Sequence, residues 1–225
     1  MKHTYLKIKK FISKVYSDTL FRTELFLKTG LTLNFIYTFF GLFTGLFYRS
    51  VWFAGTAVYY ILLCILKFYL LKKGFGIENK KTAATSELIT GRNCGRMLLL
   101  LNVVILVLIY RMIEQNKGYE YSDTVLVGTA TYTFVRLFAA VGDRIWLRKM
   151  KTPTVSAAKA LSLTVAMMSL FSFQITLLDR LGTEAALRRG LNIITGATVG
   201  ISGIFVALRL IKVTEKHLKK RKNSA

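Results

Sequence analysis

Six long apolar stretches, separated by short polar segments, dominate the hydrophobic pattern of this chain. Each has about 20 residues, and a helix of that length spans the hydrocarbon core of a bilayer because it rises about 1.5 Å per residue. The pattern therefore predicts an all-α, polytopic membrane bundle of six transmembrane helices. The predicted spans are Lys28–Tyr48, Val51–Lys72, Cys94–Ile113, Thr124–Val141, Val155–Leu178 and Leu191–Ile211.

The polar segments are too short to build a core of their own, which predicts one membrane domain over residues 26–212. Residues 1–25 place apolar side chains at near-helical spacing among lysines, which predicts an amphipathic helix on the membrane surface; the alternative is a frayed cytosolic tail. Residues 213–225 form a basic cytoplasmic tail. The connection 73–93 is rich in Gly and polar residues, which predicts an exposed loop, and Pro153 is placed to begin the fifth helix.

Positive charge alternates with the spans. The chain has 33 Lys and Arg residues against 11 Asp and Glu. If the N-terminus is cytoplasmic, and cations near the end of a span are counted with the adjoining connection, 26 of the 33 fall on the cytoplasmic side and six on the other. The remaining cation, Arg136, lies deeper in the fourth span. Because cytoplasmic loops are enriched in Lys and Arg, this bias predicts a cell-membrane protein with both termini cytoplasmic. It favours anionic lipid at the cytoplasmic face as a partner and makes nucleic-acid binding the weaker explanation of the basic composition.

Three spans carry a stripe of small or polar residues, whereas a span surrounded by lipid can be apolar all round. One interpretation is close helix packing, within the chain or in a homo-oligomer, through glycines spaced as G-x-x-x-G. The other is a polar cavity. The packing glycines are Gly41, Gly45, Gly196 and Gly200, and the candidate cavity residues are Asn34, Thr38, Arg136, Ser169, Gln174 and Asn192.

Arg136 is the most informative of these residues because a charge inside a membrane is costly and often marks a functional site. It lies about 10 Å from the inner end of its predicted helix. Asn34 lies at a similar depth in the first span, so one hypothesis is a contact between the two side chains. The alternative is snorkelling, in which Arg136 bends toward the cytoplasmic surface and pairs with Asp143.

The sequence contains no recognisable set of catalytic or metal-binding residues. No predicted span has Asp, Glu or His in its core, and neither a Ser/His/Asp set nor an H-E-x-x-H motif is present. Cys64 and Cys94 lie in or beside spans, at positions that indicate neither a disulfide nor a metal site. We therefore expect no enzymatic activity, no metal and no cofactor.

Residues 28–212 resemble the transmembrane domain of cation diffusion facilitators. The resemblance is carried by Asn34, Gly41, Gly45 and Ser50, by the second-span run VWFAGTAVYY and by the fifth-span run TVSAAKALSLTVAMMSLFSF. It implies six spans, cytoplasmic termini and a tight first hairpin.

The sequence departs from that family where the family binds metal, through carboxylates on span two and a His/Asp-type pair on span five. The family's C-terminal cytoplasmic domain also has no counterpart in the basic tail. The residues in the two metal-binding regions are Thr56, Tyr59, Tyr60, Leu161, Ser162, Val165 and Ala166. Hydroxyls are poor ligands for a transition metal, so the resemblance implies the fold but not metal transport.

Two function hypotheses remain open at this point. The first is a small transporter-like protein of unknown substrate that does not depend on intramembrane carboxylates. The second is a non-transporting structural or accessory membrane protein that acts through glycine-faced helix packing.

Reporter fusions test the predicted orientation. A reporter that works only in the cytoplasm should be active after Gly76, Met150 and Ala225, and one that works only outside should be active after Gly118 and Thr183, because the cations cluster on the cytoplasmic side. Fusions that place the 74–93 segment and the tail on opposite faces would contradict the orientation.

Overall fold

The computed structural model describes residues 19–74, 80–115, 121–146 and 152–223, and all regular structure within these ranges is helical. Six helices are long and apolar enough to cross a membrane, which confirms the predicted all-α fold class and the six spans. Residues 1–18 of the amphipathic segment predicted over 1–25 lie outside the described residues, and the rest of it belongs to the first described helix. The helices are α2 (Thr19–Phe47), α3 (Val51–Gly74), α4 (Lys80–Gln115), α5 (Asp123–Trp146), α6 (Pro153–Arg180) and α7 (Ala185–Lys222).

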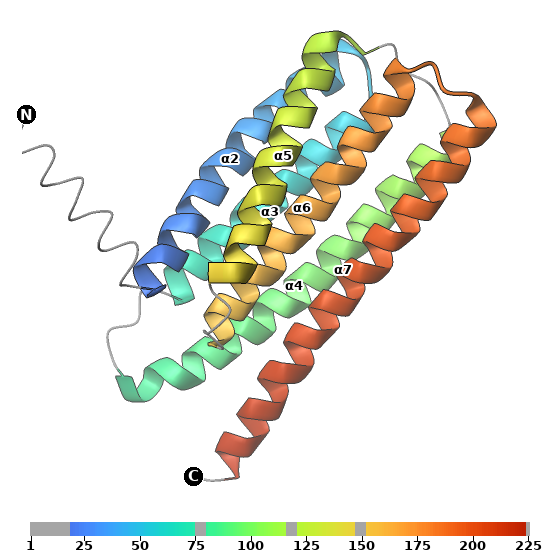
Figure 1. The fold of residues 1–225 in the computed structure, drawn as a ribbon. Helices are drawn as coiled ribbons and strands as arrows, with labels where there is room; N and C mark the ends of the chain where they lie inside the picture. The colour runs from blue at the N-terminus through green and yellow to red at the C-terminus, as the bar shows by residue number, and fades with distance from the viewer. Residues whose placement is uncertain (1–18, 75–79, 116–120, 147–151, 224–225) are drawn as a thin grey trace, which may run out of the picture.

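The helices form an elongated bundle in which successive helices run antiparallel (Figure 1). The most extensive contacts join α4 with α7, α2 with α3, and α5 with α6. Helix α6 also contacts α2, α3, α4 and α7, so it occupies the centre of the bundle. We call the end at which α2 begins the basic end. Its exposed cations include Lys72, Lys73, Lys212 and Lys219.

Local sequence signals explain two of the helix boundaries. Arg49 adopts a left-handed backbone with φ of 50°, which turns the chain between α2 and α3. The Ser50 hydroxyl then accepts a hydrogen bond from a backbone N–H in the first turn of α3. Thr152 caps α6 in the same way, and Pro153 occupies the first turn as predicted, where its missing N–H costs nothing.

Two expected polar segments are helical instead. The prediction of an exposed loop over 73–93 is wrong from Lys80 onward, where α4 begins. The expected tail is also largely helical, since α7 continues to Lys222. The physical reason is that each segment covers the other: Gly91 of α4 lies against the Thr214 side chain of α7. Packing between the two helices thus supplies burial that neither polar sequence reveals alone.

Helices α4 and α7 are the longest in the described structure, with 36 and 38 residues. At 1.5 Å per residue, each is roughly 55 Å long. They run side by side along one flank of the bundle (Figure 1). Near the basic end, Arg96 and Glu215 join them through an ion pair of 3.7 Å.

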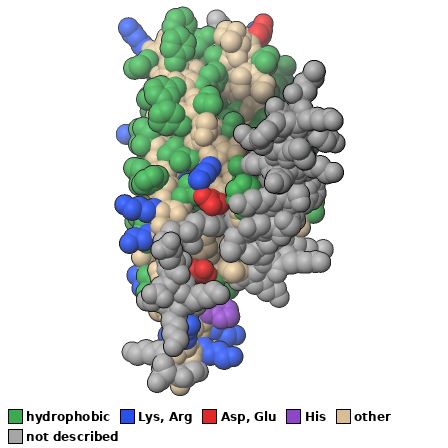
Figure 2. Space-filling view, turned by 90° about the vertical axis from the view of Figure 1, so that its left-hand side faces the viewer, with side chains coloured by type: hydrophobic (Ala, Val, Ile, Leu, Met, Phe, Trp, Pro, Cys, Tyr) green, Lys and Arg blue, Asp and Glu red, His purple; other side chains and the backbone are tan. Residues whose placement is uncertain are grey.

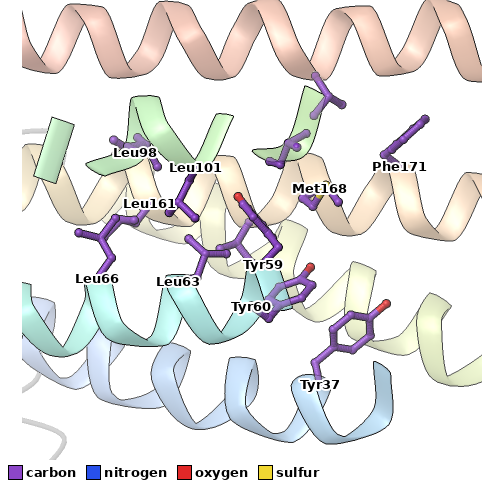
Figure 3. Close-up of a cluster of buried hydrophobic side chains, with 14 of the residues drawn as sticks. Tyr37, Tyr59, Tyr60, Leu63, Leu66, Leu98, Leu101, Leu161, Met168 and Phe171 are labelled. Carbon is purple, nitrogen blue, oxygen red and sulfur yellow. The ribbon is translucent and has the colours of Figure 1, made fainter. Parts of the chain in front are cut away.

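Large aromatic and aliphatic side chains fill the interior. Figure 3 shows tyrosines of α2 and α3 in one cluster with leucines of α3, α4 and α6. The outer surface is apolar too: in Figure 2 hydrophobic side chains cover much of the visible face, with several Lys and Arg side chains toward the basic end. A packed interior beneath an apolar exterior is the arrangement expected of a helix bundle surrounded by lipid.

The four glycines predicted to pack face neighbouring helices of the same chain. A Cβ atom at Gly45 would lie 2.7 Å from the backbone nitrogen of Ala54 on α3. Backbone atoms cannot move aside as a side-chain tip can, so this approach of α2 to α3 requires glycine. The contacts are Gly41 with Ala57, Gly45 with Ala54, Gly196 with Ile109, and Gly200 with Leu106.

Replacing Gly45 by Ala should lower the free energy of unfolding by about 1–3 kcal/mol, because the added methyl forces α2 and α3 apart. Gly190→Ala in α7 is the matched control, since nothing lies within 4 Å of a Cβ there. That control should keep or slightly raise stability because Ala favours helix. Thermal unfolding of the purified variants in detergent measures both, and equal midpoints would contradict the close packing.

Candidate functional site

Arg136 of α5 is buried in the bundle, with 4% of the residue exposed. Its Nη2 donates a hydrogen bond to Oδ1 of Asn34 on α2 at 2.8 Å. The guanidinium also lies 5.7 Å from the centre of the Tyr132 ring, within range of a cation–π interaction. The contact between Asn34 and Arg136 that their similar depth predicts is therefore present.

Asn34 is the shared acceptor of this group and is fully buried. Its Oδ1 accepts a second hydrogen bond, from the Tyr132 hydroxyl at 3.2 Å. Its Nδ2 has no hydrogen-bond partner within the described ranges. Thr38, also a predicted site residue, donates its hydroxyl to the Asn34 backbone carbonyl at 2.8 Å and so stabilises its own helix.

The alternative pairing of Arg136 with Asp143 is wrong. No ion pair joins Arg136 to a carboxylate in the part of the chain that the structure describes. Asp143 accepts a hydrogen bond from Ser162 of α6 at 2.5 Å. The predicted span ends at Val141, but α5 continues to Trp146 and packs on α6, so Asp143 is buried. Asp143 thus lies near the end of α5, beyond the predicted span, so the expectation of no Asp, Glu or His in the core of a predicted span stays a prediction.

Lys67 of α3 is a buried cation that the charge count places on the cytoplasmic side, near the end of the second predicted span. The residue is 2% exposed, and its Nζ donates to the backbone carbonyl of Gly30 on α2 at 3.0 Å. A Cβ atom at Gly30 would lie 2.9 Å from this Nζ and 3.5 Å from Nη1 of Arg136. The only signal in the sequence is position: Lys67 interrupts an apolar run five residues before Lys72.

Of the remaining predicted residues, Gln174 and Asn192 lie in a second polar group, between α6 and α7. Gln174 donates from Nε2 to Oδ1 of Asn192 at 3.4 Å and accepts from the Thr195 hydroxyl at 2.7 Å. Ser169 is linked to α5, because its backbone carbonyl accepts from Thr133 at 2.8 Å. The six predicted cavity residues thus form separate hydrogen-bonded groups, and only Asn34, Thr38 and Arg136 of the six belong with Lys67.

A cluster of tyrosines lies one helical turn from the buried cations, on the side away from the basic end. The rings of Tyr37 and Tyr132 stack with centroids 3.8 Å apart, and Tyr60 meets both edge-on. Tyr37 follows Asn34 by three residues and Tyr132 precedes Arg136 by four. These rings give the cation site a rigid aromatic wall.

Comparison with protein-family models finds none that matches the chain, and a search of curated proteins also finds no match. Function is therefore argued from the site itself.

Asn34→Leu should lower the free energy of unfolding by about 1.5–3 kcal/mol, because the buried guanidinium loses its acceptor. Asn34→Asp keeps an acceptor oxygen at the same position and adds a negative charge beside Arg136, so it should not lose this stability. Unfolding of both variants in detergent measures the difference. If Asn34→Leu is as stable as Asn34→Asp, the hydrogen bond to Arg136 contributes nothing to the fold.

Proposed function

We propose that the protein is a small transporter of the cell membrane, with both termini in the cytoplasm, and that its substrate binds at the polar group around Arg136. The observation that carries this proposal is the burial of Arg136 among α2, α3 and α5, held by Asn34 rather than extended to a surface. A charge within a membrane-spanning bundle is a functional-site hypothesis because its burial is expensive.

The position of this group also supports transport. Its side chains come from three helices, Asn34 from α2, Lys67 from α3 and Arg136 from α5, so any relative movement of these helices rearranges it. Transporters commonly bind their substrates between helices in this manner. The resemblance to cation diffusion facilitators is retained here as a hypothesis about the fold, without a metal substrate.

The alternative is an accessory protein that associates through glycine faces. The sequence supports this alternative less than it did, because Gly45 and Gly200 already pack against Ala54 and Leu106 of the same chain. These glycines are therefore not available to a partner protein. A partner would have to bind another surface, such as the exposed apolar side chains along the bundle.

Flux into liposomes that contain the purified protein tests transport. With a panel of ions and small solutes, Arg136→Leu should reduce flux of the transported solute at least about tenfold, since a charge-assisted contact is lost. Arg136→Lys should give an intermediate rate, because it keeps the charge but not the planar fork. The exposed Arg144 lies on the same helix, and Arg144→Gln is the control that should leave flux unchanged.

The absence of flux for every solute in the panel would remove the transport proposal and favour the accessory role. Equal flux in the wild type and Arg136→Leu would leave transport standing but would place the substrate elsewhere.

A further inference from the structure

Two positively charged groups converge on one point inside the bundle. Lys67 Nζ and Arg136 Nη1 lie 2.9 and 3.5 Å from the position that a Cβ atom at Gly30 would occupy. The two nitrogens therefore lie near each other, and like charges that are close repel each other where water is excluded. Their convergence therefore calls for a negative charge nearby.

The protein supplies only part of that charge. Among the described residues, Lys67, Arg136, Asp143 and Asp179 are the buried charged side chains. Asp179 lies at the far end of α6 and pairs with Arg188 at 3.6 Å. Asp143 is the buried carboxylate near the basic end among the described residues, so Lys67 and Arg136, when both are protonated, exceed it by one positive charge.

The hydrogen-bonding groups of the site also favour a negatively charged ligand, because among the described residues several donors there are unpaired and few acceptors are. The Lys67 ammonium can donate three hydrogen bonds and makes one in the described structure, to Gly30. The buried Nδ2 of Asn34 has no partner there. The acceptors beside these donors, Asn34 Oδ1 and the Gly30 carbonyl, are already used. Such a site complements a ligand that only accepts hydrogen bonds.

We propose that Gly30, Asn34, Lys67 and Arg136 form a binding site for a monovalent oxyanion, such as a carboxylate. This rests on the proposed function and names the substrate class of that site. One negative charge balances the excess positive charge, and oxyanion oxygens accept from ammonium, guanidinium and amide groups at once. Glycine at position 30 lets the Lys67 ammonium approach the α2 backbone beside Arg136.

An apolar groove of about 470 Å³ runs along the α2–α3 seam at the level of this site. It is the place where an apolar tail attached to the oxyanion would lie. Leu31 of the lining follows Gly30 directly, and Cys64 and Phe68 flank Lys67 along α3. The lining residues are Leu31, Thr32, Phe35, Cys64, Ile65 and Phe68.

Ligand-induced stabilisation of the full-length protein in detergent tests the proposal. The probes are acetate, nitrate and octanoate, with acetamide as a neutral analogue of acetate, all in a background salt of a bulky sulfonate. A ligand that binds the folded state raises the unfolding midpoint. We expect a concentration-dependent rise with acetate and nitrate and none with acetamide.

Lys67→Met should weaken acetate binding at least about tenfold, whereas Lys72→Met, at an exposed position of the same helix, should leave it unchanged. Gly30→Ala provides a second variant, because its methyl displaces the Lys67 ammonium while keeping all charges. Tighter binding of octanoate than of acetate would indicate a ligand whose apolar tail lies in the groove. Equal binding would indicate a small anion without a tail. Both results support the site.

A shift that persists in Lys67→Met and Gly30→Ala would overturn the site, since the anion would then bind elsewhere. The absence of any shift with all three anions would also overturn it. The two proposals can fail separately. If no anion binds but Arg136→Leu abolishes the flux of a neutral solute into liposomes, the anion site is wrong and the transport proposal still stands.

Discussion

The hydrogen bond from Arg136 to Asn34 joins α2 and α5, which also meet through the Tyr132–Asn34 hydrogen bond and the Tyr37–Tyr132 ring stack. In an apolar bundle surrounded by lipid, hydrophobic burial gives helices little reason to choose one neighbour over another, so polar contacts and close packing select the arrangement. A buried guanidinium must find acceptors inside the protein, since water is not present to supply them. Asn34 fixes where α5 can lie, and the tyrosine stack then packs beside it.

Glycine packing and the buried cations act together on α2. Gly45 brings α2 against α3 near the turn, while Gly30 lets the Lys67 ammonium reach the α2 backbone near the basic end. The two contacts lie about four helical turns apart on one helix. The α2–α3 seam is therefore held at both ends, by shape at one and by a charge-assisted hydrogen bond at the other.

Length and hydrophobicity predict the six spans because both are local properties of the chain. The contact of Asn34 with Arg136 is also predictable, since depth along a helix can be counted from the sequence. The start of α4 is not, because this polar segment packs through Gly91 against Thr214 of α7, more than a hundred residues away. Lys67 is missed for a similar reason: its distance to Lys72 indicates a loop cation, whereas its burial depends on Gly30 of another helix. Gln174 and Asn192 share the polarity of the site but not its location.

The length of α4 and α7 has a mechanical consequence. Each is nearly twice as long as the roughly 30 Å hydrocarbon layer is thick, so a large part of this helical pair stands clear of the lipid. The two antiparallel helices share the most extensive packing in the bundle, so they form one continuous flank of it. A change in the tilt of this pair within the bilayer would therefore displace its ends, beyond the hydrocarbon layer, further than its middle.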